Sequence, residues 1–262
     1  MKIIIVGPAY PYRGGIAAFG ERLAREFAAE GHDVEMVTFT LQYPSFLFPG
    51  KTQYSEEPAP AGLHVERQIN SINPFNWIRV GRALRKKKAD LAVVAFWLPY
   101  MAPALGTIAR ISKTPAVGLV HNLIPHEHRP GDKLFARYFC GSVSRFVGLS
   151  ESVLGDIGCM SPAKPAVFNP HPLYDNFGSP VARQEACGRL GLDPACRILL
   201  FFGLIRDYKG LDWLLEAFAS LGRRDNVRLV VAGEFYADGA KYHELAKSLG
   251  IDDEVVWKTQ FV

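Results

Sequence analysis

The stretch RILLFFGLIRDYKGLDWLLEAF, residues 197–218, decides the fold. Its opening run, 198–202, is continuously apolar, which is typical of a strand buried on both faces of a parallel sheet. The segment from Leu211 to Phe218 then follows the i, i+3, i+4, i+7 spacing of an amphipathic helix. The loop from Gly203 to Gly210 is therefore predicted at the carboxyl end of a parallel strand, where open α/β sheets bind ligands.

Two cations in this loop, Arg206 and Lys209, indicate an anionic ligand. A guanidinium and an ammonium next to a helix N-terminus are suited to phosphate oxygens. The structural alternative is a solvated basic loop, but the position at a strand end favours phosphate.

Strands alternate with helices along the rest of the chain, which predicts an α/β fold with parallel, doubly wound sheets. Strands are expected at 2–6, 33–39, 63–67, 89–97, 116–120, 145–149, 166–168, 197–202, 227–232 and 254–258. The clearest helices are expected at 15–30, 210–222 and 238–249. Three prolines between Asn169 and Pro180 predict a link between two domains, residues 1–176 and 177–262. The second has too few βα units for a complete domain, so we expect a fragment of a longer enzyme or a natural truncation.

Composition narrows the class of protein. With 48% hydrophobic residues among 262, the chain can bury a substantial core. Residues 1–176 carry 19 basic and 14 acidic side chains, too weak an excess for a nucleic-acid footprint. The N-terminus is expected to be a first strand and not a signal peptide, and no apolar run approaches a membrane span. The four cysteines are widely spaced and indicate reduced thiols, hence a cytoplasmic protein.

Two nucleotide-binding patterns are excluded. The loop after the first strand, Gly7 to Gly15, lacks the GxGxxG spacing of dinucleotide folds, although Gly14 and Gly15 offer bare backbone N–H groups to an anion. The sequence PGKT at 49–52 mimics the end of a P-loop, but it has neither the earlier glycine nor a preceding strand.

Several short sequences together resemble glycosyltransferase family 4. They are Gly14-Gly15, Val120-His-Asn122, Ser150-Glu-Ser152, Phe201-Phe-Gly203 and Tyr208-Lys-Gly210. The resemblance implies a GT-B fold, with two Rossmann-like domains facing across a cleft. It also implies retaining transfer of a sugar from a nucleotide-sugar to a saccharide or lipid-linked acceptor, with no metal or other cofactor.

The resemblance also implies site residues. Lys209 corresponds to the lysine that binds the donor diphosphate, with Gly203 at the strand end. The family's arginine directly after that glycine is Leu204 here, so Arg206 is expected to supply its charge. His121 corresponds to a residue that contacts the donor sugar and is our predicted catalytic residue. Further positions of the expected donor site and cleft are Gly14, Gly15, Asn169, His171, Glu234 and Gln260 to Val262. A Glu-x7-Glu motif of the family would follow residue 262.

Three alternatives stay open. His121, His126, Glu127 and His128 could form a metal site, although their spacing matches no common zinc pattern. The chain could be a non-catalytic binding module. It could also be a GT-B epimerase or phosphorylase.

The basic segment from Trp77 to Lys88 has two interpretations. One is a membrane-surface helix, which would place the protein at the inner face of the membrane, in peripheral contact with it. The other is a solvated basic face above an ordinary core stripe of Trp77, Val80 and Leu84.

Overall fold

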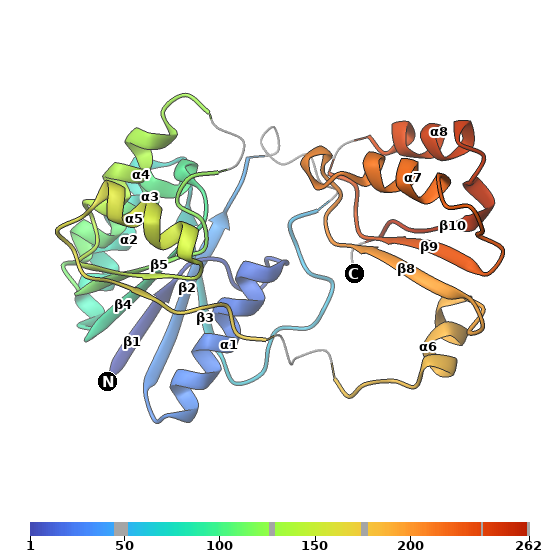
Figure 1. Cartoon of the computed structure of the whole chain (residues 1–262). Coiled ribbons are helices and arrows are strands. Elements are labelled where there is room, and N and C mark those ends of the chain that lie inside the picture. Colours follow the sequence, from blue (N-terminus) through green and yellow to red (C-terminus); the bar gives the residue numbers. More distant parts are fainter. Residues whose placement is uncertain (45–51, 126–128, 174–177, 237, 261–262) are drawn as a thin grey trace. The chain divides into compact units, whose positions relative to one another are not determined.

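The computed structural model describes residues 1–44, 52–125, 129–173, 178–236 and 238–260. The chain forms two compact units (Figure 1): unit 1 comprises Met1–Leu47 and Gln53–Leu173, and unit 2 comprises Phe48–Thr52 and Tyr174–Val262. The predicted boundary at residue 176 and positions 49–51 of the P-loop-like sequence lie outside the described residues.

Unit 1 is built on a seven-stranded parallel sheet in the order β3-β2-β1-β4-β5-β6-β7. The strands are β1 (Lys2–Val6), β2 (Asp33–Leu41), β3 (His64–Asn70), β4 (Leu91–Phe96), β5 (Ala116–Val120), β6 (Arg145–Gly148) and β7 (Ala166–Phe168). The helices are α1 (Gly15–Ala29), α2 (Pro74–Lys87), α3 (Ala102–Ser112), α4 (Asp132–Cys140) and α5 (Glu151–Met160). The strand order reverses between β1 and β4, so the loops that follow these strands diverge at the edge where ligands bind in such sheets.

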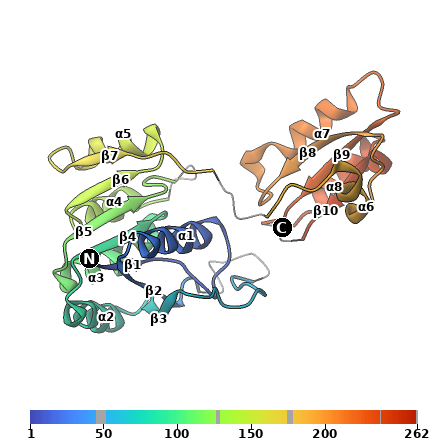
Figure 2. The same cartoon turned by 90° about the horizontal axis from the view of Figure 1, so that it is seen from below.

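Helices cover both faces of this sheet (Figure 2). Buried side chains of a strand belong alternately to the two layers between sheet and helices. Along β1, Ile3 and Ile5 pack in one apolar cluster with Phe19 of α1. Ile4 and Val6 belong to the other cluster, which contains residues of α2, α3 and α4. Because successive residues of β1 are buried on opposite faces of the sheet, the sequence of this strand is a continuous apolar run.

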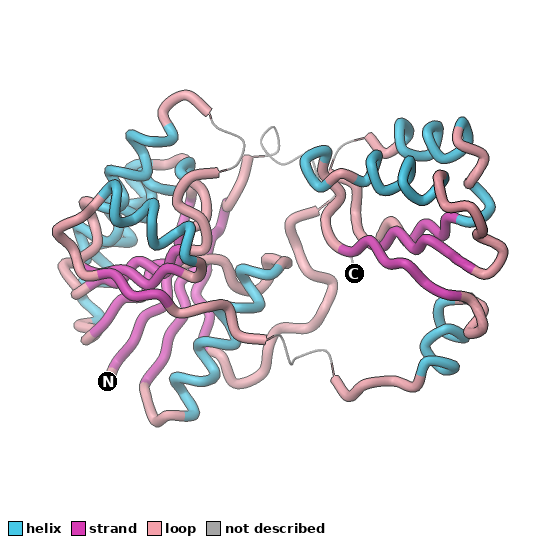
Figure 3. The backbone as a smooth tube through the Cα atoms, in the orientation of Figure 1, coloured by secondary structure: helices cyan, strands magenta, loops and turns pink. Residues whose placement is uncertain are grey.

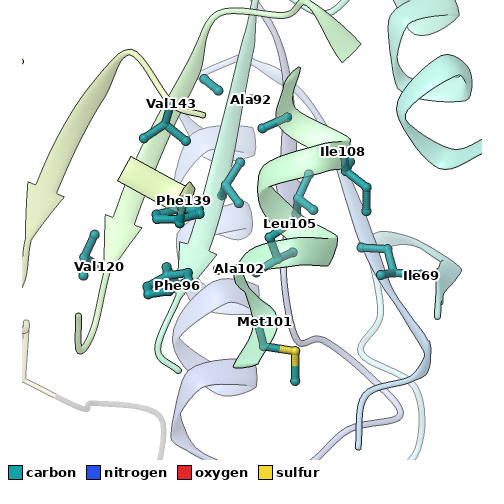
Figure 4. Packing of buried hydrophobic residues seen from close by; sticks show 14 of the residues in the cluster. Ile69, Ala92, Phe96, Met101, Ala102, Leu105, Ile108, Val120, Phe139 and Val143 are labelled. Atoms are coloured by element: carbon teal, nitrogen blue, oxygen red, sulfur yellow. The ribbon is translucent and has the colours of Figure 1, made fainter. Parts of the chain in front are cut away.

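The larger cluster has its centre at the β4–α3–α4 contact (Figure 4). Phe96 of β4 and Phe139 of α4 stack with ring centres 4.0 Å apart, and Leu105 of α3 is fully buried beside them. Stacking of two buried aromatic rings adds about 0.5–1.5 kcal/mol to the burial of their area. This packing holds the carboxyl ends of β4 and β5, and therefore the loops after them, in fixed positions.

Unit 2 contains a three-stranded parallel sheet in the order β10-β9-β8 (strands magenta in Figure 3). Its elements are α6 (Arg183–Leu190), β8 (Arg197–Phe202), α7 (Leu211–Ala219), β9 (Val227–Ala232), α8 (Ala240–Ser248) and β10 (Val255–Lys258). Leu215 and Phe218 of α7 pack with Tyr242 of α8 and Val231 of β9 in a buried cluster. Both units thus confirm the predicted α/β class with parallel, Rossmann-like sheets.

Three features of unit 2 differ from the prediction. The strand 197–202 is not buried on both faces, because β8 is an edge strand and Leu200 and Phe202 are 61% and 60% exposed. The predicted helix 210–222 ends at Ala219, three residues earlier than the apolar spacing suggested. The helix at 183–190, with only one buried residue, was not predicted, since it has no apolar stripe.

Candidate functional site

The cationic loop of unit 2 follows β8 as predicted and is fixed by backbone geometry. Gly203 has a φ of 111° and Gly210 a φ of 69°, both in the left-handed region that favours glycine. Between them lies a short 3-10 turn, Asp207–Lys209. Gly210 is the N-cap residue of α7 and has no side chain to cap the helix, so α7 starts immediately after the loop.

The two cations occupy different positions on this loop. A Cβ atom added to Gly203 would lie 3.1 Å from Nζ of Lys209, so the ammonium lies over the turn at the end of β8. The guanidinium carbon of Arg206 lies 3.7 Å from the centre of the Tyr236 ring, a close cation–π contact. Arg206 is half-buried and Lys209 exposed. The loop therefore presents a guanidinium held on an aromatic ring and an exposed ammonium, a pair that is suited to binding phosphate.

The acidic residue of the loop is engaged elsewhere. Asp207 Oδ1 accepts hydrogen bonds from Nζ of Lys241 (2.6 Å) and from the hydroxyl of Tyr242 (3.0 Å), both in α8. The hydrogen bond from Lys241 holds the pKa of Asp207 below its usual value. Because Asp207 is tied to α8, its charge is compensated there and it anchors the loop from behind.

A second segment, directly after β9, supports the loop. The backbone N–H of Ile205 donates to the carbonyl of Glu234 at 2.9 Å, and that of Gly203 donates to the carbonyl of Ala232 at 2.9 Å. The Glu234 side chain is 5% exposed, so the predicted donor-site carboxylate is a buried group beside the loop. The sequence analysis did not identify Tyr236 or the anchor formed by Lys241 and Tyr242. For Tyr236, the available signal was an aromatic residue two positions after Glu234. Phe261 and Val262 lie outside the described residues.

In unit 1, Gly14 and Gly15 stand at the start of α1, as predicted. Gly14 is the N-cap with a φ of 110° and provides no side-chain cap for the helix amides. The preceding loop is held by hydrogen bonds from the N–H of Ala9 to Thr38 Oγ1 (3.0 Å) and from the N–H of Tyr10 to Glu21 Oε1 (2.7 Å). Backbone N–H groups at a helix N-terminus without a side-chain cap are suited to an anion.

His121 follows β5 directly, and its N–H donates to the carbonyl of Phe96 at 2.8 Å. Its ring meets Phe19, one turn after Gly15, edge-on with centres 5.1 Å apart, and the His171 ring lies 5.5 Å away. Burial, with a smaller contribution from the charge of His171, lowers the pKa of His121 to about 4. Its Nε2 is buried without a hydrogen-bond partner among the described residues. His121 is therefore a neutral imidazole at pH 7, placed beside the α1 N-terminus.

Three residues of the metal alternative, His126, Glu127 and His128, lie outside the described residues. Elsewhere in the described part of the chain, Glu35, His64 and Glu66 have ligand atoms within 4.8 Å of one another. The ammonium of Lys87 bonds to both carboxylates, at 3.0 Å from Glu66, and so occupies the position that a cation would take. We interpret this cluster as an ion-pair network.

Removal of divalent ions is therefore expected to have no effect on folding. Prolonged EDTA treatment followed by a thermal melt should give the melting temperature of the untreated protein. A clear fall in melting temperature that added zinc restores would instead support a site at His121–His128.

Within the described ranges, no helix has both the length and the apolar character needed to cross a bilayer.

Comparison with known proteins identifies the family. Residues 13–171 match the model of Glycosyltransferase Family 4, and residues 183–260 match that of Glycosyl transferases group 1. An uncharacterized glycosyltransferase of Methanocaldococcus jannaschii is 22% identical over 98% of this chain and 69% of that protein. A D-inositol 3-phosphate glycosyltransferase of Segniliparus rotundus is 37% identical, but the match spans 31% of this chain and only 19% of the relative's length.

Solved structures agree on the fold. Anabaena HepE in complex with UDP and glucose superposes with a TM-score of 0.73 at 14% identity, over 100% of this chain and 70% of that one. WaaG, a glycosyltransferase involved in lipopolysaccharide biosynthesis, gives a TM-score of 0.67 at 18% identity over 99% of this chain and 70% of that one. These neighbours are GT-B proteins with Rossmann-like domains. Since the family model covers more than half of the chain, the protein belongs to glycosyltransferase family 4.

Proposed function

We propose that this chain serves in retaining transfer of a sugar from a nucleotide-sugar to a saccharide or lipid-linked saccharide, on the cytoplasmic side of a membrane. The observation that supports this most is the pair of cations at the end of β8, with Lys209 over the Gly203 turn and Arg206 stacked on Tyr236. The relatives with UDP or UDP-glucose bound share this fold. In the proposal, the diphosphate of the donor lies against these two cations.

The proposed reaction requires that the negative charge on the leaving diphosphate be stabilised. The bond between the sugar C1 and the diphosphate oxygen breaks, and the acceptor hydroxyl forms a new C1–O bond on the same face. The hydroxyl proton passes to a phosphate oxygen of the leaving diphosphate. Lys209 and Arg206 would stabilise the negative charge that develops on this group, an effect that is strongest when the donors are already in place.

His121 has a different part in the proposal, as a contact for the donor sugar. A pKa of about 4 leaves its ring neutral at physiological pH, so it would hydrogen-bond to a sugar hydroxyl and would not supply a positive charge. The Nε2 atom, which has no partner among the described residues, supports this assignment, because a buried polar atom without a partner is costly until a ligand bonds to it.

Replacing Lys209 with alanine tests the donor site. We expect the Lys209→Ala variant to bind UDP more weakly than the wild type by about 1.5–3 kcal/mol, the range for a hydrogen bond to a charged group. Isothermal titration calorimetry with UDP on the whole chain measures this difference.

Lys247→Ala provides a matched control, since Lys247 is an exposed lysine in the last turn of α8. It should bind UDP like the wild type. Equal affinity of the wild type and Lys209→Ala would remove Lys209 from the donor site. Turnover of a nucleotide-sugar to an epimer or a sugar phosphate, with no acceptor added, would favour the epimerase or phosphorylase alternative.

A further inference from the structure

The two loops that follow β8 and β9 pair with each other a second time. Ile205 and Phe235 form a parallel β-bridge after the two strands have ended. The N–H of Tyr236 donates to the carbonyl of Ile205 at 3.0 Å, which continues the pairing by one step. Residues 204–206 and 234–236 therefore lie side by side as a short parallel ladder, which we name the loop ladder.

The two residues of the bridge face the helices of unit 2. Ile205 is 2% exposed and belongs to the buried cluster that contains residues of α7 and α8, and Phe235 packs against the same cluster. Successive side chains of an extended strand point to opposite sides. Arg206 and Tyr236, the next residue on each side of the loop ladder, therefore point away from the helices. There they meet, with the guanidinium carbon 3.7 Å from the centre of the ring.

The ring is the one partner that the structure gives to the Arg206 side chain. Among the described residues, its guanidinium forms no ion pair and no hydrogen bond. Asp207, the next residue, bonds instead to Nζ of Lys241 at 2.6 Å. A guanidinium that lies over an aromatic face without a carboxylate partner still offers its N–H donors to an anionic ligand. Tyr236 therefore orients the charge of Arg206 without neutralising it.

Such support matters here because of where the arginine lies in the loop. Leu204 stands directly after Gly203, and the arginine follows two positions later. A long side chain that is free in solution loses rotamer entropy when it binds a ligand. If the side chain is already held in one place, most of that cost has been met before the ligand arrives. The contact with Tyr236 does this for Arg206.

We propose that Tyr236 is a positioning residue for the donor diphosphate. It acts through Arg206, by holding the guanidinium where the diphosphate binds, and contacts no substrate itself. The inference deepens the proposed function and rests on it, since that function places the diphosphate against Arg206 and Lys209.

A double-mutant cycle tests the positioning role. In calorimetry with UDP on the whole chain, Tyr236→Leu should lower the affinity about 3- to 30-fold, the range of a cation–π contact. In the background of Arg206→Ala, the same change should have no further effect, because the side chain that Tyr236 orients is gone. An equal loss in both backgrounds would overturn the proposal, and so would a Tyr236→Leu protein that binds UDP like the wild type.

Tyr236→Phe is the matched control, since it keeps the ring and removes only the hydroxyl. That hydroxyl has no hydrogen-bond partner among the described residues, so this variant should bind UDP within about twofold of the wild type. A loss as large as that of Tyr236→Leu would assign the effect to the hydroxyl and overturn the proposal. If Tyr236→Leu melts below the assay temperature, Tyr236→Gln takes its place with the same expectation, because the position is half-exposed.

Nuclear magnetic resonance without ligand separates this inference from the proposed function. In mildly acidic buffer, the ring of Tyr236 should shift the Nε–H proton of Arg206 upfield in the wild type and in Tyr236→Phe. The shift should disappear in Tyr236→Leu. A wild type that binds UDP but lacks the shift would overturn the positioning role alone. A wild type that shows the shift but binds no UDP would contradict the proposed function, and with it the role of the stacked arginine in donor binding.

Discussion

Replacing Lys87 with methionine is expected to destabilise unit 1 by about 3–5 kcal/mol, the cost of leaving a buried charge without its partner. Nζ of Lys87 bonds to Glu35, whose side chain is 8% exposed, and to Glu66 at 3.0 Å. Methionine fills a similar volume but offers no charge or donor. The Glu35 carboxylate on β2 would then face the interior unpaired. Urea unfolding at pH 7, followed by circular dichroism, measures the change.

Lys86→Met is the matched control, because Lys86 is exposed and has no ion pair among the described residues. It should change the free energy of unfolding by no more than about 0.5 kcal/mol. If Lys87→Met unfolds at the same urea concentration as Lys86→Met, the network contributes nothing to stability and the buried-charge argument is wrong.

The same network predicts a pH dependence. The hydrogen bond from Lys87 lowers the pKa of Glu66 from 4.5 in the folded protein. A lowered carboxyl pKa gives stability that is complete above the unfolded value and is lost as the pH falls through the folded value. The contribution of Glu66 is therefore present at pH 7 and declines below about 4.5. Unfolding curves of the wild type from pH 7 to pH 3 should show this decline, and those of Lys87→Met should show less of it.

The sequence predicted the fold well where local pattern and burial agree. Runs such as 3–6 and 116–120 are apolar because helices cover both faces of the unit 1 sheet, and the strands predicted at 2–6 and 116–120 appear at those positions. The same reasoning was wrong for residues 197–202, since an apolar run does not reveal whether a strand lies inside a sheet or at its edge. It also could not predict the 183–190 helix, which has a single buried residue.

For the candidate site, the sequence located loops but not the contacts within them. Lys209 and Gly14 were found because each follows a strand and opens a helix, a local feature. The stacking of Arg206 on Tyr236 and the anchoring of Asp207 by α8 join residues about 30 positions apart, and no spacing rule predicts such pairs. The lowered pKa of His121 likewise comes from burial against Phe19 and His171, which only the folded chain brings together.

The other large expected effect belongs to Gly233, a glycine outside every motif of the sequence analysis. Gly233 follows β9 with a φ of 136°, and a Cβ atom there would lie 2.1 Å from the carbonyl oxygen of Gly203. Gly233→Ala therefore combines backbone strain of about 1–3 kcal/mol with an overpacking cost of about 1–3 kcal/mol. We expect unit 2 to lose about 2–6 kcal/mol in free energy of unfolding.

Gly233→Ala should also weaken UDP binding, because the atom that must move, the carbonyl oxygen of Gly203, belongs to the turn beneath Lys209. Pushing the Gly203 carbonyl away from β9 strains the bonds from Gly203 to Ala232 and from Ile205 to Glu234, which hold the cationic loop. A Gly233→Ala protein that still folds should therefore bind UDP more weakly than the wild type, as measured by calorimetry. Gly222→Ala is the control in the same unit, since its Cβ would meet no atom within 4 Å. A Gly233→Ala protein as stable as Gly222→Ala would mean that the two strand ends can separate freely, and the loop geometry proposed for the donor site would have to be abandoned.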